Sequence, residues 1–408
     1  MPASPGPAPS APVRPGQSAH TDWIAVTAVI AAGVLVSVQL GKLPPLLSGL
    51  RAEFGFGMVL AGLVASSFNL VGAVIGIVAG VASDRIGSRR ALGAGLLVCA
   101  AGSLLGGLAQ DVPLLLIARL IEGCGFVLTV VCAPSLLTAA SYSGQRALVL
   151  GFWSAYMPLG VALGMLGALP VGLLFDWREL WFGLATLLAV AAIIILRLTR
   201  GIMLPPARQF SAAPLKRAGP WLLAGCFACY TTQWFAIVTW IPTYLRDSGV
   251  TSETTISAGA ALIVLINVLG NLSSAALMHR GVPRWLIIAV VSLVMSLFGV
   301  AAFAAGIPVT AKIALAMAAT GFGGMLPAAV LASVPQQAYN PGEIATVNGV
   351  VIQLLNIGSF IGPPGLAALV THLGGWNQGR WLLLVAGCVS LLLALALRRV
   401  ERRRKIAP

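Results

Sequence analysis

The stretch Gly80–Arg90, GVASDRIGSRR, separates two long apolar runs, 58–79 and 91–109. Each run is long enough to cross a bilayer as a helix, because a spanning helix needs roughly 20 apolar residues. The stretch between them is therefore a short basic turn that joins two membrane helices, with Gly87 permitting the reversal of the chain. Its three arginines predict that the turn lies on the cytoplasmic side of the membrane.

The composition of the whole chain agrees with a membrane protein. Of its 408 residues, 58% are hydrophobic and only 9% are charged, whereas soluble domains carry about 25% charged residues. The net charge of +14 does not indicate nucleic-acid binding, because the positive residues fall mostly in alternate loops and in the C-terminal tail. The six cysteines are expected to be small buried side chains. No nucleotide-binding or catalytic motif is present, so we expect no cofactor, no metal and no enzymatic activity.

Twelve apolar runs divide the chain into two sets of six. The sequence predicts a disordered cytoplasmic tail at 1–21, a six-helix bundle at 22–199, a proline-containing linker at 200–218, a second six-helix bundle at 219–398 and a basic tail at 399–408. An even number of spans places both termini on one side, and the loop charges make that side cytoplasmic. The predicted fold is therefore an all-α polytopic membrane protein with twelve transmembrane helices.

The two halves of the chain are related by an internal repeat. A shift of 198 residues brings five glycines of the first half onto five glycines of the second half. The same shift brings Pro44 onto Pro242 and Leu47 onto Leu245. Two parallel six-helix repeats are typical of transporters, so the repeat predicts two pseudo-symmetric bundles.

The basic turn resembles the G-x-x-x-D-R-x-G-x-R signature between the second and third helices of the major facilitator superfamily. Two positions, Ala82 and Ser88, depart from residues that are common in that family. The resemblance implies transport by alternating access of the two halves, with the matching residues as a latch on the cytoplasmic face. An ordinary charged loop that only fixes the orientation is the alternative. The matching residues are Gly80, Asp84, Arg85, Gly87 and Arg89.

Arg119 and Glu122 are ionisable residues within the fourth predicted helix, and their spacing places them on one face. Charged residues inside a membrane are rare and usually functional. Together with Gly123 and Gly125, Arg119 resembles a fourth-helix motif of the same superfamily, in which the arginine is linked to proton transfer. The resemblance implies proton coupling through Arg119 and Glu122. A structural ion pair that only stabilises helix packing is the alternative.

Lys42 lies near the outer end of the first predicted helix, 23–43, and shares a face with Gln39. Its ammonium is a candidate to attract an anionic substrate, and snorkelling to the outer interface is the alternative. With Lys42 and Arg119 beside a single clear mid-membrane carboxylate, the cavity is expected to be positive. Gln39, Lys42 and Arg119 are therefore candidate substrate ligands.

Aromatic and amide side chains on three other predicted helices are further candidate substrate ligands. Their alternative role is to hold helices together through hydrogen bonds, which are worth about 0.6 to 2 kcal/mol each in membranes. They are Tyr156 on the fifth helix, Tyr230, Gln233 and Trp234 on the seventh, and Gln353 and Asn356 on the eleventh.

Two short segments, TWIPTYL at 239–245 and MPLG at 157–160, are similar to the cyanate-permease-like branch of the superfamily. We expect a monomeric transporter in the bacterial inner membrane that carries a small organic or inorganic anion by proton symport. The alternative is proton-coupled efflux of an amphipathic compound by antiport. The superfamily's antiporters show a glycine before the proline of the fifth helix, and this chain has Met157 before Pro158.

Overall fold

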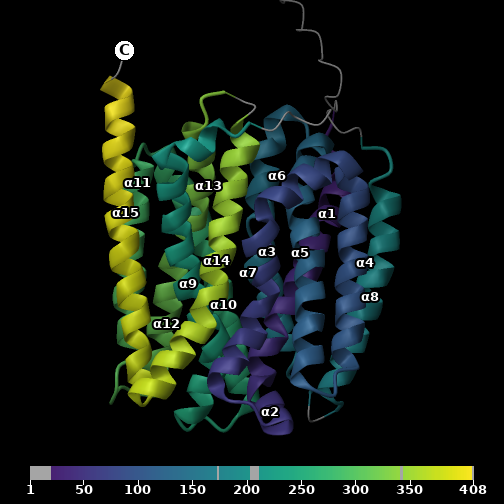
Figure 1. Cartoon of the computed structure of the whole chain (residues 1–408), viewed down its shortest axis with the longest axis vertical. Helices are drawn as coiled ribbons and strands as arrows, with labels where there is room; N and C mark the ends of the chain where they lie inside the picture. The colour runs from purple at the N-terminus through teal and green to yellow at the C-terminus, as the bar shows by residue number, and fades with distance from the viewer. Residues whose placement is uncertain (1–19, 172–173, 203–210, 341–342, 407–408) are drawn as a thin grey trace, which may run out of the picture.

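The computed structural model describes four ranges of the chain, and the first 19 residues lie outside them (Figure 1). Twelve helical segments in the described ranges are long and apolar enough to cross a membrane, and these ranges contain no β-strand. The predicted all-α fold with twelve spans is therefore confirmed. The domain boundaries remain predictions. The described ranges are 20–171, 174–202, 211–340 and 343–406, except the side chains of 77–86, 147, 345 and 403–406.

The first six spans contain eight α-helices. The first span comprises α1 and α2, and a break in the fifth span separates α6 from α7. Aspartates start three of the helices, because their side chains accept hydrogen bonds from backbone N–H groups of the first turn. The helices are α1 (Trp23–Gly41), α2 (Leu43–Phe54), α3 (Met58–Ile86), α4 (Ser88–Gly107), α5 (Val112–Ala140), α6 (Arg146–Trp153), α7 (Tyr156–Gly167) and α8 (Trp177–Leu198).

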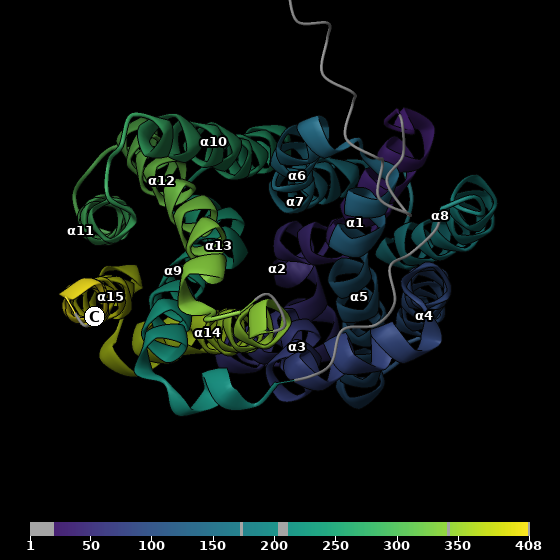
Figure 2. The same cartoon turned by 90° about the horizontal axis from the view of Figure 1, so that it is seen from above.

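The second six spans contain seven α-helices, and the tenth span comprises α12 and α13. Figure 2 shows the helices of the two halves as two groups that meet along α3 and α14 and along α7 and α10. The helices are α9 (Ala218–Asp247), α10 (Glu253–His279), α11 (Arg284–Ala302), α12 (Val309–Gly323), α13 (Met325–Gln337), α14 (Ile344–Leu373) and α15 (Arg380–Ile406).

The predicted first helix, 23–43, corresponds to α1 (Trp23–Gly41), but the first membrane span does not end there. The first span continues from Trp23 to Phe54, because Pro44 and Pro45 occupy the first turn of α2. Proline is tolerated at the start of a helix, where its missing N–H group would have no intrahelical partner. Lys42 therefore lies in the interior of a 32-residue span rather than near its outer end.

The two halves pack closely along α3 and α14. A Cβ atom at Gly62 would lie 2.8 Å from the Cα atom of Pro364. A Cβ atom at Gly72 would lie 2.5 Å from the side chain of Asn356. Small residues let membrane helices approach closely, so these two glycines set the distance between the halves.

The halves are also joined at the end of the bundle opposite the described C-terminal segment. We call this the distal end, and α2 lies there (Figure 1). Gly55 and Gly249, which follow α2 and α9 closely in the sequence, both have a positive φ. Here the Arg246 guanidinium of α9 donates a hydrogen bond of 2.6 Å to the Ser48 hydroxyl of α2. These residues are 198 positions apart, which equals the repeat shift. Equivalent segments of the two repeats therefore meet at the distal end.

Candidate functional site

Lys42, Arg119 and Glu122 form a buried ion cluster inside the first half. Glu122 Oε1 lies 2.7 Å from Lys42 Nζ, and Glu122 Oε2 lies 2.5 Å from Arg119 Nη1. All three side chains are 0% exposed. One carboxylate between two cations leaves one excess positive charge. In a medium of low dielectric constant, this charge acts more strongly and over a longer distance than it would in water.

The joint between α1 and α2 positions Lys42. The Lys42 backbone N–H donates to Val38 O at 2.9 Å, so the helical path continues through the joint. Gly41 presses this joint against α7, because a Cβ atom at Gly41 would lie 1.9 Å from Val161 O. Only glycine fits at such a contact with backbone. The joint is therefore held on one side by α7 and on the other by the ion cluster.

Polar and aromatic groups from three helices, α1, α4 and α8, surround the cluster. Lys42 Nζ donates to Ser103 Oγ of α4 at 3.2 Å and lies 3.9 Å from the ring centroid of Trp181 in α8. Ser103 Oγ donates to Trp181 O at 3.0 Å. Arg119 Nη1 donates to Gln39 O at 2.8 Å. The structure thus brings together the predicted residues Gln39, Lys42, Arg119 and Glu122.

Sequence reasoning missed Ser103 and Trp181 as members of this cluster. Ser103 is a hydroxyl within an otherwise apolar run, which is a weak signal for a buried polar contact. The position of Trp181 in the sequence does not indicate a contact with buried charges, because tryptophan near a helix end is also typical of the membrane interface. The unpaired groups of the cluster are all hydrogen-bond donors: Gln39 Nε2, Arg119 Nε and Nη2, and Trp181 Nε1. The described surroundings are therefore rich in donors as well as positively charged.

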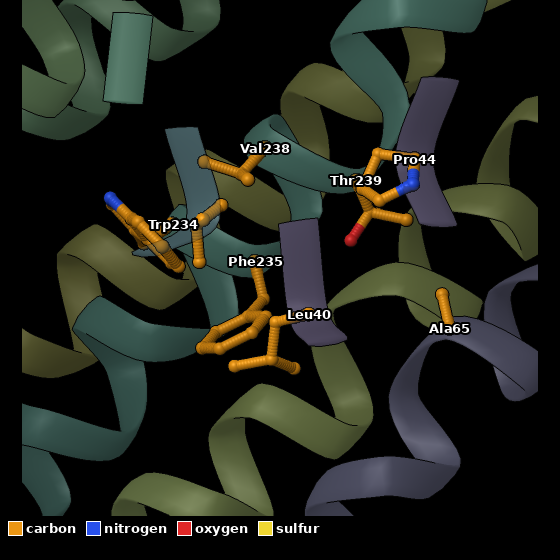
Figure 3. Close-up of a pocket in the computed structure, with 8 residues that line it drawn as sticks. Leu40, Pro44, Ala65, Trp234, Phe235, Val238 and Thr239 are labelled. Carbon is orange, nitrogen blue, oxygen red and sulfur yellow. The ribbon is translucent and has the colours of Figure 1, made fainter. Parts of the chain in front are cut away.

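A small pocket, with room for about one water molecule in this conformation, lies between the two halves (Figure 3). Leu40 and Val238, two of the residues that line it, are 198 positions apart and thus equivalent in the repeat. No charged side chain of the described residues lines the pocket. It is therefore an uncharged site where the repeats meet, lined mostly by apolar residues together with the Thr239 hydroxyl and the Trp234 indole. Its lining comprises Leu40, Pro44, Ala65 and Val161 from the first half and Trp234, Phe235, Val238 and Thr239 from α9.

One helical segment connects the pocket with the ion cluster. Leu40 and Pro44 line the pocket, whereas Gln39 and Lys42 contact the cluster. Residues 40 and 44 share one helical face, and residue 42 points to a different one. A shift of the joint therefore changes the shape of the pocket and the geometry of the cluster together.

Of the other predicted ligands, Trp234 lines the pocket, with its indole N–H buried and unpaired. Tyr230 Oη accepts a hydrogen bond from Asn267 Nδ2 of α10 at 3.0 Å. Gln233 is buried in α9, and its Oε1 has no partner among the described residues. The ring of Tyr156 stacks on that of Trp153 with centroids 4.1 Å apart.

The remaining two predicted ligands, Gln353 and Asn356, pack against Gly76 and Gly72 of α3. They therefore lie where the two halves touch. Substrate binding by all nine predicted residues remains a prediction. The apolar lining of the pocket was not predicted, because apolar residues in apolar helices give no sign of the direction they face.

The predicted latch is described only in part. Gly80, Asp84 and Arg85 lie outside the described side chains. Gly87 has a φ of 89°, a left-handed conformation that favours glycine, and it separates α3 from α4. Arg89 Nε and Nη2 donate to the Leu196 carbonyl of α8 at 3.1 and 2.5 Å, so Arg89 holds the end of that helix. A latch function for the five residues remains a prediction.

Comparison with known proteins identifies the family. Residues 29–363 match the family model described as Major Facilitator Superfamily. The chain belongs to this superfamily. Its members are membrane transporters, and the predicted family is thereby confirmed.

Curated relatives within this superfamily differ in their stated substrates. The Hexuronate transporter of Bacillus subtilis (strain 168) is 25% identical over 368 residues, covering 84% of this chain and 85% of the relative. The Cyanate transport protein CynX of Escherichia coli (strain K12) is 24% identical over 318 residues, covering 74% and 79%. The Lincomycin resistance protein of Streptomyces lincolnensis is 27% identical over 205 residues, or 47% of this chain and only 42% of that relative.

A solved structure agrees with the fold. It is a bacterial homolog of the human lysosomal transporter Spinster in an inward-facing and occupied conformation. It superposes with a TM-score of 0.76 at 15% sequence identity, covering 92% of this chain and 96% of that chain. At this identity the likeness shows the fold alone.

Proposed function

We propose that this transporter carries a small organic or inorganic anion together with protons by alternating access, and that Glu122 is the proton-binding group. The observation that carries the proposal is the buried cluster, in which one carboxylate bridges two cations. The cluster shares the α1–α2 joint with the pocket between the halves. Protonation of Glu122 therefore changes the electrostatic potential in the pocket and the position of the joint that lines it.

The sign of the electrostatic coupling favours symport of an anion. The cluster carries a charge of +1 when Glu122 is ionised and +2 when Glu122 is protonated. An anion in the pocket is thus bound more tightly when Glu122 is protonated. By thermodynamic linkage, the bound anion strengthens proton binding by the same factor. Proton and anion therefore bind together, whereas a cation and a proton would exclude each other.

The electrostatic coupling between the cluster and the pocket is large enough to change the affinity for the anion by more than tenfold. The pocket and the cluster lie on different faces of one helix, which is about 10 Å across with its side chains. Two unit charges about 10 Å apart at an effective dielectric constant of about 20 interact by about 1.7 kcal/mol. This energy changes the affinity for the anion by a factor of about 17.

Protonation also has a mechanical consequence. Glu122 is the only acidic partner of Lys42 among the described residues. When the carboxylate is neutral, the ion pair that holds the α1–α2 joint against α5 is lost. The joint, which also carries Leu40 and Pro44 of the pocket, is then free to move during alternating access.

The test is uptake of radiolabelled cyanate and small carboxylates into proteoliposomes with and without an inward proton gradient. For symport of one proton with each monovalent anion, an inward gradient of one pH unit drives about tenfold accumulation of the anion. Glu122→Gln is expected to abolish gradient-driven accumulation. Glu179→Gln, which changes an exposed acid at the start of α8, is the matched control. The proposal is contradicted if the wild type accumulates the anion to the same level with and without the proton gradient.

A second candidate function is proton-coupled efflux of an amphipathic compound. The apolar lining of the pocket favours it, as do relatives named as Lincomycin and Puromycin resistance proteins. An amphipathic cation would be exchanged for protons, because the coupling described above has the opposite sign for a cation. Extrusion of a lipophilic cationic dye under an opposite gradient, without uptake of any anion, would favour this function.

We further propose that the protein works as a monomer in the bacterial inner membrane with both termini cytoplasmic. The cluster and the pocket are each formed within one chain, and the loop charges support this orientation. Reporter fusions at the two termini test the orientation, because reporters active only in the periplasm should be inactive at both.

A further inference from the structure

Five arginines gather at the proximal end of the bundle, opposite the distal end. Figures 1 and 2 show α11 beside α15, with α15 running beyond the neighbouring helices at this end. The Arg398 guanidinium lies 4.1 Å from the ring centroid of Trp285, so the start of α11 and the end of α15 are in direct contact. The five are Arg280 and Arg284 around the α10–α11 turn, and Arg398, Arg399 and Arg402 on α15.

The group carries five positive charges, and one acidic residue, Glu401, lies among them in the sequence of α15. None of the five arginines forms a salt bridge with another described residue. Arg284 Nη1 and Arg398 Nε are buried and lack a hydrogen-bond partner. Glu401 is the nearby acid in the sequence of α15, and it accepts a hydrogen bond from Gln337 at 2.9 Å. The surface therefore offers both positive charge and unused donors.

The same two helices expose apolar stripes deeper in the membrane. Leu286, Val290, Leu293 and Leu297 of α11 follow one helical face and are 37% to 56% exposed. On α15 the exposed apolar residues include Val385, Val389, Leu392 and Leu395. A basic surface at the membrane edge thus continues into an apolar one. This succession matches the two parts of an anionic phospholipid.

We propose that this surface binds an anionic phospholipid, and we call it the α11–α15 lipid site (Arg280, Arg284, Trp285, Arg398, Arg399 and Arg402). The arginines bind the headgroup phosphate, because guanidinium groups pair with phosphate oxygens through two parallel hydrogen bonds. The Trp285 ring lies at the level of the headgroups, as is common for tryptophan in membrane proteins. The acyl chains lie along the apolar stripes.

The site is expected to bind an anionic phospholipid more tightly than a free phosphate ion. Basic residues at the membrane edge attract anionic headgroups, but a free ion gains nothing from the apolar stripes. A lipid in this position touches both α11 and α15, which lie at the periphery of the second half (Figure 2). Its binding therefore stabilises the packing of these two helices.

The test measures binding of fluorescent phosphatidylglycerol to the purified full-length protein in a neutral detergent. Each basic residue near the surface contributes about fivefold in affinity, so Arg284→Gln with Arg398→Gln is expected to weaken binding about 25-fold. Arg399→Gln with Arg402→Gln changes two exposed side chains and keeps the Trp285 contact. This second pair tests the charge without disturbing the packing, and a comparable loss is expected.

Arg90→Gln with Arg200→Gln is the matched control. Both arginines are exposed, and they lie at the same end of the bundle but in the first half. Affinity within twofold of the wild type is expected for this pair. Phosphatidylglycerol should also raise the Tm of the wild type, whereas phosphatidylcholine and inorganic phosphate should not.

Three results would overturn the proposal. The first is equal binding of phosphatidylglycerol by the wild type and by both site pairs. The second is competition by inorganic phosphate at the same concentration as the lipid, which would make the surface a simple anion site. The third is an equal loss of affinity in the control pair, which would show that total charge alone matters.

Discussion

Gly41→Ala tests how tightly the α1–α2 joint is held. The added Cβ atom would lie 1.9 Å from Val161 O and 2.6 Å from Val161 C, both backbone atoms of α7. Cβ atoms in folded proteins do not come so close to other heavy atoms. Backbone atoms within a packed helix cannot move to relieve the clash, whereas the end of a flexible side chain can change its rotamer. The joint must therefore move away from α7 by more than 1 Å, and it carries Lys42 and Leu40 with it.

The cost of this movement can be estimated. Overpacking a well-packed interior costs about 1 to 3 kcal/mol, and a clash with backbone belongs at or above the upper end of that range. At an unfolding entropy of about 2.1 cal/mol/K per residue, a loss of about 3 kcal/mol lowers the Tm by about 3 to 4 °C. Gly49→Ala in α2 is the control, because a Cβ atom there meets nothing within 4 Å. It should gain up to about 1 kcal/mol from the better helix propensity of alanine.

Thermal unfolding of the two variants, followed by loss of monomer on gel filtration, measures this difference. Proton-driven uptake should fall in Gly41→Ala and stay unchanged in Gly49→Ala, since the first variant displaces both Lys42 and the pocket. If Gly41→Ala is as stable as Gly49→Ala, the claim that the joint packs too closely against α7 to accept a Cβ atom is refuted. If it is unstable but transports normally per folded molecule, the joint does not couple the cluster to the pocket.

Two further predictions concern contacts outside the site. The backbone N–H of Tyr339 and the Arg217 guanidinium lower the pKa of the Glu343 carboxyl. Its stabilising effect is therefore full above the unfolded-state pKa of about 4.3 and is lost as the pH falls through the lowered folded pKa. Glu343→Gln should thus lower the Tm at pH 7 and have little effect below the folded pKa, as measured by thermal unfolding across pH. Arg246→Gln removes the hydrogen bond to Ser48 across the halves, so a cysteine placed in the pocket should be labelled faster from the distal side.

Each of these predictions has a matched control. Lys312→Gln is the control for the labelling experiment, because Lys312 Nζ donates to Ser248 within one half. Equal labelling in the two variants would mean that the contact across the halves does not hold the distal end closed. Glu179→Gln removes an exposed acid and should change the Tm only slightly at pH 7. A constant Tm difference between Glu343→Gln and the wild type down to pH 3 would refute the linkage argument.

The amino-acid sequence by itself determined the number of spans, the internal repeat, and the presence of Arg119 and Glu122 inside the fourth span. The physical reason is the bilayer, which requires about 20 apolar residues per span and makes each buried charge conspicuous. The superfamily was also recognisable from the basic turn at Gly80–Arg90. Arg119 and Glu122 could be paired from their spacing, since residues three apart on a helix are neighbours.

Only the tertiary structure decided what these residues contact. Neither interpretation of Lys42 included its pair with Glu122, which is 80 positions away in the sequence. Helices that are apolar all round have no polar face, so the sequence does not reveal the direction in which a given side chain points. Ser103 in the cluster and Leu40 in the pocket therefore could not be assigned before the helices were packed. The side that each helix turns toward its neighbours is determined by close contacts between helices, such as Gly41 against Val161, which form only in the folded bundle.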